Sequence, residues 1–378
     1  MPLDVAIVGA GPVGATLAAL LAPLGLDVAL FEARAGAASD RRTLALSHGS
    51  RELLEEAGAW PVGSTPITSI HVSQMGGPGR TLLEAAEQGI PALGYTVSYA
   101  ALEAALLARL AGCAVAVHFG EACNGIDLAS DQATVRFASG REIHARMLVL
   151  ADGGANAARI PGVAFHEKDY DQSAVVGMVR SDRPHGGRAY ERFTPRGPMA
   201  LLPVESHFGL VWTAAPMEAQ RLLALQPREF LDQLQARFGD RAGAFTAIEN
   251  RGAFALRLRA VNTPVALRTA IIGNAAQALH PIAGQGLNLG LRDAAELAQS
   301  IAAAPAQVGS RAMLDAYRDA RRRDAGRGIA FTDLLVSTFA DGRRVPTWGR
   351  GLALTALDLF PPARRWLAQR MIHGAPAP

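Results

Sequence analysis

The chain has 378 residues, of which 49% are hydrophobic, so it can bury a large core and is long enough for two closely joined domains. Its net charge of +3, from 37 Lys and Arg against 34 Asp and Glu, argues against nucleic-acid binding as its main function. Cys113 and Cys123 are too few for a disulfide framework. With no room for a signal peptide and no apolar stretch of about 20 residues, the chain is expected to be cytoplasmic.

The first predicted elements form one continuous pattern. Residues 4–8 (DVAIV) have the apolar character of a buried parallel strand and lead into Gly9–Gly14, which has the spacing G-x-G-x-x-G. An apolar helix over 15–24 and a second strand over 28–31 follow, and Glu32 comes at the end of that strand. Strand, glycine turn, helix, strand and acidic residue are together typical of a dinucleotide-binding unit.

Each glycine of this turn has a physical role in such a unit. Gly9 makes the turn, Gly11 leaves room for a pyrophosphate, and Gly14 allows the helix to pack on the strand. Glu32 would accept hydrogen bonds from the hydroxyls of an adenosine ribose. The alternative interpretation is a tight strand-to-helix turn that binds no ligand.

The next part of the chain adds elements to this first domain. We expect a loop and then a helix from Arg41–Ser47 onward, and an apolar-periodic helix over 100–111. Strands of one layer are predicted over 114–119, 133–137 and 142–150. A turn containing Asp152 and Gly153 follows the last strand, where Asp152 either contacts a ligand or only caps the turn.

The middle of the chain changes character before the first domain resumes. Between 170 and 214 the apolar residues alternate and are separated by Gly and Pro turns, which predicts an inserted antiparallel sheet. One or two helices are expected over 217–238 and a strand over 252–259. Residues 270–274 return to the nucleotide domain, and helices dominate from Gly286 onward.

The predicted fold class is therefore α/β. A discontinuous, Rossmann-like three-layer domain carries an inserted antiparallel-sheet domain and a helical C-terminus. The expected boundaries are 1–169 with 262–342 for the nucleotide domain, 170–261 for the inserted substrate domain and 343–378 for the C-terminal helical segment.

The stretch 273–293 contains the most informative loop. Gly284 and Gly286 allow the backbone to approach a flat ligand closely, and a helix begins beside them. The first N–H groups of that helix are unpaired and carry a partial positive charge of about half a unit. This arrangement would stabilise a ligand that becomes negatively charged during its reaction, such as a reduced flavin.

Three motifs together resemble the single-component FAD-dependent aromatic hydroxylases related to p-hydroxybenzoate hydroxylase, nearly end to end. The first motif is Gly9–Gly14 with Glu32, and the second is Asp152-Gly153 with Arg159. The third comprises the following residues: Gly273, Ala275, Ala276, Pro281, Gly284, Gln285 and Gly286. Only one G-x-G-x-x-G is present, which indicates one tightly held dinucleotide and a nicotinamide donor without its own Rossmann fold.

Two positions depart from the family pattern. Asn274 stands where the family has an Asp that binds the ribityl hydroxyls, and Gln277 stands where it has His. An Asn can still accept a hydrogen bond from a hydroxyl, so FAD binding should persist. These variants, with Arg42–Leu46, Glu191–Thr194 and Gly197-Pro198, resemble the branch of the family in ubiquinone biosynthesis.

The resemblance implies FAD as cofactor and NAD(P)H as transient electron donor, with no metal. Together with the motifs it implies these cofactor-binding residues: Gly9, Gly11, Gly14, Glu32, Arg42, Asp152, Gly153, Gly273, Asn274, Gly286, Leu287 and Asn288. It places Pro281, Gly284, Gln285 and Gly286 at the reaction centre. Tyr190, Phe193, Trp212 and His280 are candidates for substrate contact, although aromatic residues on alternating strands are usually core residues.

The implied function is hydroxylation of a polyprenylated methoxyphenol in ubiquinone biosynthesis, with O2 as co-substrate. The alternatives are a hydroxylase of another aromatic compound and a non-catalytic flavin-binding redox subunit. Contact with other quinone-biosynthesis enzymes is compatible with this function, and the sequence leaves the oligomeric state open.

The C-terminal segment 343–378 combines six Arg with one acidic residue, Asp358, and with interleaved large apolar residues. One interpretation is a basic amphipathic surface that rests on anionic lipid at the inner face of the membrane. The other is a helical cap on the core with a solvated basic face.

Overall fold

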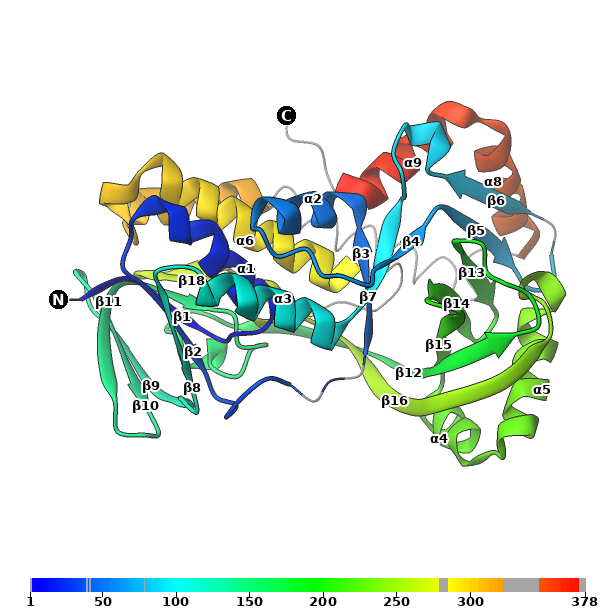
Figure 1. The fold of residues 1–378 in the computed structure, drawn as a ribbon, viewed down its shortest axis with the longest axis horizontal. Coiled ribbons are helices and arrows are strands. Elements are labelled where there is room, and N and C mark those ends of the chain that lie inside the picture. Colours follow the sequence, from blue (N-terminus) through cyan, green and yellow to red (C-terminus); the bar gives the residue numbers. More distant parts are fainter. Residues whose placement is uncertain are drawn as a thin grey trace.

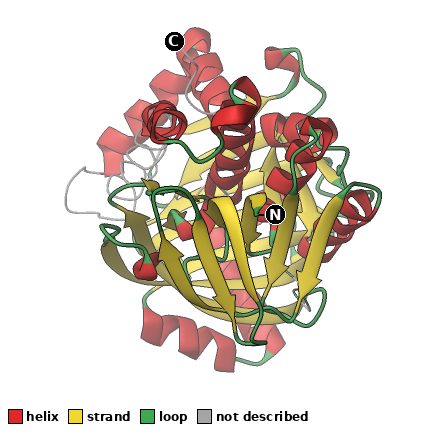
Figure 2. Ribbon diagram, turned by 90° about the vertical axis from the view of Figure 1, so that its left-hand side faces the viewer, coloured by secondary structure: helices red, strands yellow, loops and turns green. Residues whose placement is uncertain are grey.

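The structure is a computed structural model that describes residues 2–38, 40, 42–77, 79–278, 285–322 and 347–373. Two large sheets lie at opposite ends of the molecule, and the long strands β12 and β16 extend from one half toward the other (Figure 1). A view from the side shows the strands between helices above and a helical segment below (Figure 2).

The first sheet contains the nucleotide-binding unit predicted from the sequence. Five of its strands run parallel: β1 (Leu3–Val8), β2 (Val28–Glu32), β8 (Val115–Phe119), β11 (Glu142–Leu150) and β18 (Thr269–Ile271). Three further strands pair antiparallel at its margins: β9 (Cys123–Leu128), β10 (Ala133–Phe137) and β17 (Val265–Ala266).

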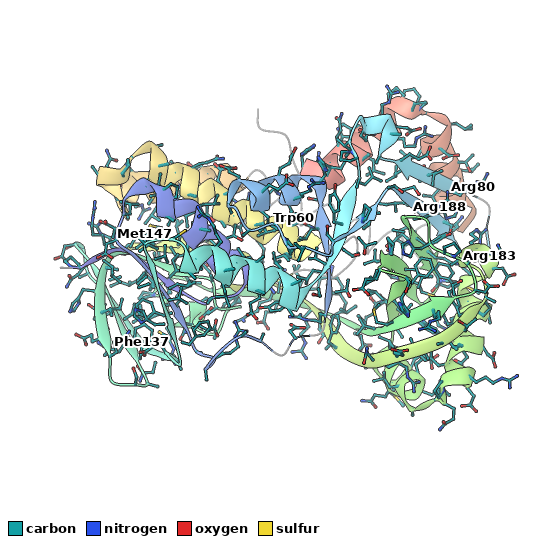
Figure 3. All side chains as sticks on the ribbon, viewed as in Figure 1. Trp60, Arg80, Phe137, Met147, Arg183 and Arg188 are labelled. Atoms are coloured by element: carbon teal, nitrogen blue, oxygen red, sulfur yellow. The ribbon has the colours of Figure 1, made fainter. Side chains whose placement is uncertain are left out.

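Both faces of this sheet are buried, as expected of parallel strands. Val5 and Ile7 on β1 face a core that includes residues of the helices α1 (Pro12–Leu21), α3 (Tyr99–Ala111) and α6 (Gln285–Ala303). Ala6 and Val8 face the opposite core, toward β9 and β10. Met147 lies in the first core and Phe137 in the second (Figure 3).

The second sheet has the order β19-β16-β12-β15-β14-β13-β5-β6. Its strands are β5 (Ser69–Gln74), β6 (Arg80–Glu84), β12 (Phe165–Ser181), β13 (Arg188–Thr194), β14 (Gly197–Val204), β15 (His207–Ala214), β16 (Phe245–Val261) and β19 (Gln277–Ala278). Neighbours pair antiparallel except β13 and β5, which run parallel. Helices α4 (Pro216–Ala224) and α5 (Pro227–Phe238) pack on one face, below the sheet in Figure 1.

Smaller elements join the two halves. A three-stranded sheet contains β3 (Thr43–Ser47), β4 (Thr65–Ile67) and β7 (Gly94–Ser98), and α2 (His48–Glu56) follows β3. The C-terminal helices α8 (Thr347–Leu359) and α9 (Pro361–His373) lie against β6 (Figure 1), and residues 311–322 are also helical. Short 3-10 turns occur at Ala22–Leu24, Ala86–Gln88, Ala157–Arg159, Asp240–Ala242, Gly273–Ala275 and Pro305–Gln307.

The predicted α/β fold class is confirmed, with two differences in detail. A loop and a helix were expected from Arg41–Ser47, but Thr43–Ser47 forms a strand because its residues pair with β7. The helix α2 begins after it, where Ser47 is the N-cap and accepts a hydrogen bond from the Ser50 N–H. The second sheet also takes β5 and β6, so Ser69–Glu84 adds two strands from the segment assigned to the nucleotide domain. Its central strands span Phe165–Val261, close to the 170–261 expected.

Candidate active site

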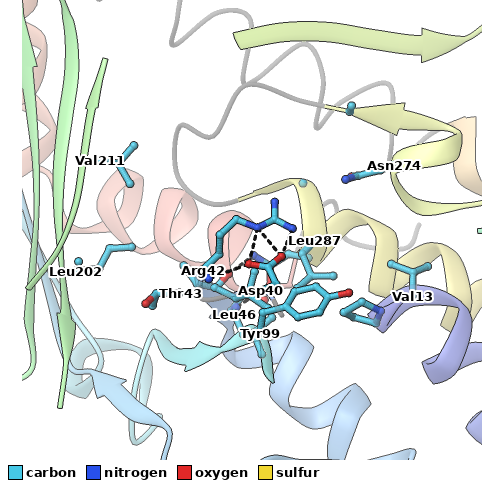
Figure 4. Close-up of a pocket in the computed structure, with 18 of the residues that line it drawn as sticks. Val13, Asp40, Arg42, Thr43, Leu46, Tyr99, Leu202, Val211, Asn274 and Leu287 are labelled. Atoms are coloured by element: carbon cyan, nitrogen blue, oxygen red, sulfur yellow. Dashed lines mark hydrogen bonds and ion pairs between the residues drawn. The ribbon is translucent and has the colours of Figure 1, made fainter. Parts of the chain in front are cut away.

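A cavity of about 1320 Å³ lies between the two halves of the molecule. One end is lined by the starts of α1 and α6, and the other by the face of the second sheet. Figure 4 shows Val13 and Asn274 on one side and Leu202 and Val211 on strands at the other, with Arg42 between them. The cavity therefore connects the nucleotide-binding motifs with the domain predicted to hold substrate.

The glycines at the start of α1 are needed for different reasons. Gly9 has φ of +109°, which side chains rarely adopt, and a Cβ on Gly14 would lie 2.1 Å from the Gly9 carbonyl oxygen. A Cβ on Gly11 would instead point into open space, with the Tyr99 hydroxyl as its nearest neighbour at 3.9 Å. Gly11 is the N-cap and no side chain caps this helix, so its first N–H groups are available to a phosphate.

Glu32 lines the cavity at the end of β2 but is already held by the chain. One carboxylate oxygen accepts from the Ala10 N–H at 2.8 Å, and the other accepts from the backbone and side chain of Arg34. Burial alone would raise the pKa of Glu32, but these hydrogen bonds lower it below its usual value. The carboxylate is thus fixed in its ionised form, with acceptor capacity left for a ribose hydroxyl.

Arg42 lies in the middle of the cavity, before β3. Its guanidinium binds Asp40 at 2.6 Å and lies over the Tyr99 ring, 5.7 Å from the ring centre (Figure 4). The side chain is well exposed, at 64%, so it can turn toward a phosphate or ribityl oxygen without unfolding anything. Its predicted contact with the cofactor stays a prediction.

Asp152 performs the turn-capping role that the sequence left as one of two alternatives. Its two oxygens accept from the backbone N–H groups of Gly154 and Asn156, both at 2.9 Å, and Asn156 adds a side-chain hydrogen bond at 2.7 Å. Gly153 has φ of +72°, and a Cβ there would meet nothing within 4 Å. Both Asp152 and Gly153 line the cavity, so a ligand contact remains compatible with the capping role.

A buried ion pair fixes the turn after β18. Asp293 on α6 accepts from the Gly273 N–H at 2.9 Å and from the Gln277 amide at 2.8 Å, and it pairs with Arg321 at 2.7 Å. Gln277, which replaces the family's His, therefore has a structural partner. Asn274 lies at the top of this turn, with its amide exposed toward the cavity (Figure 4).

The start of α6 forms another wall of the cavity. Gly286 and Leu287 line it, and Asn288 is locked by hydrogen bonds with Ser47, Ser50 and the Ala45 carbonyl. Asn288 thus holds the helix start against β3 and α2, a role that the sequence did not suggest. Of the residues predicted at the reaction centre, Gln285 is the first of α6, while Pro281 and Gly284 lie outside the described residues, as does His280.

The predicted substrate aromatics separate onto two faces of the second sheet. Phe193 lines the cavity, whereas Trp212 does not and packs against Phe230 of α5, 5.6 Å between ring centres. The prediction for Trp212 is therefore corrected, because strand alternation turns it to the helix-covered face while Val211 faces the cavity. Tyr190 borders the cavity, but its hydroxyl donates to the Arg241 carbonyl at 3.1 Å on the other face.

One family of known proteins matches almost the whole of this architecture. The FAD binding domain family matches residues 2–332. The chain belongs to this family. The flavoprotein has the cradle that FAD requires, since Gly11 and the uncapped N–H groups of α1 leave space and donors for its pyrophosphate.

Curated relatives agree with this assignment along most of their length. The flavoprotein is 35% identical to ubiquinone hydroxylase UbiL of Rhodospirillum rubrum, over 96% of this chain and 87% of the relative. It is 30% identical to 3-demethoxyubiquinol 3-hydroxylase of Escherichia coli, over 77% of this chain and 78% of the relative. The flavoprotein is an FAD-dependent monooxygenase by family.

A solved structure shows the same fold in a more distant protein. The p-nitrophenol 4-monooxygenase PnpA from Pseudomonas putida DLL-E4 superposes with a TM-score of 0.81 at 17% identity, covering 100% of this chain and 99% of that one. Within the described part of the flavoprotein, no helix combines the length and apolarity needed to cross a membrane.

Proposed function

We propose that the flavoprotein hydroxylates a polyprenylated methoxyphenol in ubiquinone biosynthesis. The observation that supports this most is the apolar character of the substrate end of the cavity. Ile70, Val72 and Leu202 line it from the sheet, and the C-terminal helices add Leu354, Leu357, Leu367, Ala368 and Ile372. Such a surface suits a neutral ring with a long hydrocarbon tail.

The charged groups of the cavity argue against a soluble, carboxylated aromatic substrate. Of the described arginines that line it, Arg34 and Arg159 belong to the nucleotide end, and Arg42 lies in the middle, where it is paired with Asp40. Among the described residues, the sheet end has no basic side chain that could pair with a carboxylate. A recognition site for benzoate-type substrates would need a cation at this place.

In the proposed reaction, one oxygen atom of O2 enters the ring and the other leaves as water, while NAD(P)H supplies the two electrons. FAD supplies the oxygen-activating chemistry when bound. The chain contributes the helix starts of α1 and α6, which line the cavity at Gly11 and Gly286, and the positive end of a helix dipole favours negative charge on a ligand. A redox subunit without turnover would consume no NAD(P)H in proportion to a phenol.

Quinone analysis of a strain lacking the gene tests this function. We expect a prenylated methoxyphenol that lacks one hydroxyl to accumulate, and the intact gene to restore the quinone. Normal quinone content in the deletion strain would contradict the proposal.

The surface of α8 and α9 supports contact with a membrane, where such a substrate resides. Leu352, Leu359, Phe360 and Trp366 are all more than half exposed, although their neighbours on these helices line the cavity. Arg365 is exposed beside them, and the Arg370 guanidinium lies 5.2 Å from the centre of the Trp366 ring. We infer that this face rests on anionic lipid and admits the prenyl tail.

Replacing Leu359, Phe360 and Trp366 by serine should lower partitioning onto phosphatidylglycerol-containing vesicles at least about tenfold. Full burial of one such side chain in the lipid contributes about 1.5–3 kcal/mol to the free energy of binding, and about 1.4 kcal/mol corresponds to a tenfold change in the partition coefficient. Co-sedimentation measures the effect. Met217→Ser, at a residue 85% exposed on α4, is the matched control and should pellet like the wild type. Equal pelleting of the triple variant would refute lipid contact through this face.

A further inference from the structure

We propose that Glu191 is a catalytic residue of this chain that accepts the proton of the substrate phenol hydroxyl. The inference rests on the proposed function and goes beyond it by naming the group that activates the ring. Glu191 lies on β13, in the part of the second sheet that lines the cavity. In the sequence it drew attention only as part of the segment Glu191–Thr194.

The strand registers place Glu191 in the middle of a row that crosses the sheet. It pairs with Val72 on β5 and with Ala200 on β14. Beyond them, Val72 pairs with Thr81, and Ala200 pairs with Val211. Paired residues share one face, and every member of this row lines the cavity. Glu191 is therefore the ionisable group in a row that is otherwise without charge.

The surroundings of Glu191 are apolar. Ala189 and Phe193, two residues away in each direction on β13, line the cavity too, and the described side chains of α8 and α9 that line it are all apolar. No hydrogen bond or ion pair joins the Glu191 carboxyl to another described residue. Its side chain is half-buried and lines the cavity. The Glu191 carboxyl is thus available to bind a ligand in the cavity, because no described side chain or backbone group binds it.

Charged groups on neighbouring elements are directed elsewhere. Arg192 on the same strand donates to the Arg237 carbonyl on the opposite face, and Arg188 donates to Ser69. The His71 ring on β5 lies beside Tyr190 on that opposite face, with 5.8 Å between the ring centres. On the covering helices, Asp358 and Arg364 are ion-paired, Arg364 also with Glu87, and on β6 Arg80 and Glu84 are exposed. Burial without a compensating charge raises the pKa of Glu191 to about 8.

A raised pKa suits a base that acts on a phenol. The phenol of a tyrosine has a pKa of about 10 and an ordinary glutamate about 4.3, so transfer to an ordinary carboxylate is strongly uphill. With a pKa near 8, Glu191 has a smaller pKa difference from the phenol, so the proton transfer is less uphill. An unpaired Thr81 hydroxyl, buried in the same row, provides a second polar group at this end of the cavity.

The proton transfer is balanced within the reaction. The phenol O–H bond breaks and an O–H bond forms on a Glu191 oxygen, which leaves the ring oxygen negative and the ring richer in electrons for attack on oxygen. After the new C–O bond has formed, the ring loses its C–H proton to water. Glu191 then returns its proton to the original ring oxygen, and both hydroxyls of the product are complete.

The test uses the FAD-loaded, full-length enzyme with 2-geranyl-6-methoxyphenol as substrate. For the wild type, kcat/KM should rise with pH and level off above about pH 8, because the base must be ionised. Glu191→Gln should lose about 10²–10⁴-fold in product formation and should lose this rise. Glu191→Asp should retain the rise, since it keeps a carboxylate. Glu84→Gln, at an exposed carboxyl on the same sheet, should behave as the wild type.

A second measurement needs no turnover. In infrared difference spectra of the substrate-free, FAD-loaded enzyme, a protonated-carboxyl band should disappear near pH 8 in the wild type and be absent from Glu191→Gln. Wild-type rates and an unchanged pH profile in Glu191→Gln would overturn the assignment to Glu191 alone. A wild type that forms no hydroxylated product would overturn the proposed function and the assignment together.

Discussion

Replacing Asp293 by alanine is expected to lower the free energy of unfolding by about 3–5 kcal/mol, because it breaks a buried ion pair by removing one partner. Asp293 is 2% exposed and Arg321 is 4% exposed, and the carboxylate also accepts from Gly273 and Gln277. The substitution therefore removes charge compensation and two hydrogen bonds at once. The shift of the urea midpoint of the FAD-loaded protein measures the loss.

Two comparisons separate this effect from that of an ordinary salt bridge. Asp315 pairs with Arg311 and Arg318 on the surface of the helical stretch 311–322, and Asp315→Ala should move the midpoint far less. The double change Asp293→Leu with Arg321→Met should recover much of the stability, because no buried charge is left. An Asp293→Ala midpoint equal to that of Asp315→Ala would show that the pair does not hold the Gly273 turn.

Replacing Gly14 by alanine should lower both the stability of the nucleotide-binding unit and its affinity for FAD. Gly11→Ala should lower only the affinity for FAD. At Gly14 the new Cβ would lie 2.1 Å from the Gly9 carbonyl oxygen, so α1 must move away from the turn that follows β1. At Gly11 the new Cβ meets no protein atom closer than 3.9 Å and occupies only space for a ligand. Overpacking of this kind costs about 1–3 kcal/mol, roughly a five- to 150-fold loss of FAD affinity.

Flavin content after purification and the thermal midpoint without added FAD distinguish the two variants. Gly36→Ala is the control, because a Cβ at Gly36 meets nothing within 4 Å and Gly36 does not line the cavity. Wild-type FAD affinity in Gly11→Ala would mean that the pyrophosphate does not pass this turn.

The sequence predicted well those parts of the site that depend on local pattern. The glycine turn and the Asp152-Gly153 turn follow from residues a few positions apart, and Gly9, Gly11 and Asp152 line one cavity. The hydrogen bonds of Asp152 show the capping role, which was the weaker of its two interpretations, and its contact with a ligand stays a prediction. The α/β class and the inserted sheet followed from the change in hydrophobic period near 170.

The sequence could not predict features that depend on strand register or on ion pairs between residues far apart in the chain. Trp212 and Glu191 lie on opposite faces because of strand parity, and a shift of one residue would reverse every such assignment. Nothing in the short segment 69–84 distinguishes a strand of the first sheet from one of the second. The partnership of Asp293 with Arg321 joins two helices whose packing is a tertiary property.

The central claim is that one cavity holds FAD at its nucleotide end and a neutral prenylated phenol against the second sheet. The most direct test is turnover of 2-geranyl-6-methoxyphenol by the FAD-loaded protein with NAD(P)H under ¹⁸O2, followed by mass spectrometry of the product. The account predicts one labelled oxygen in each product molecule and one NAD(P)H consumed for it. Unlabelled product, or NAD(P)H oxidation without any hydroxylated phenol, would contradict it.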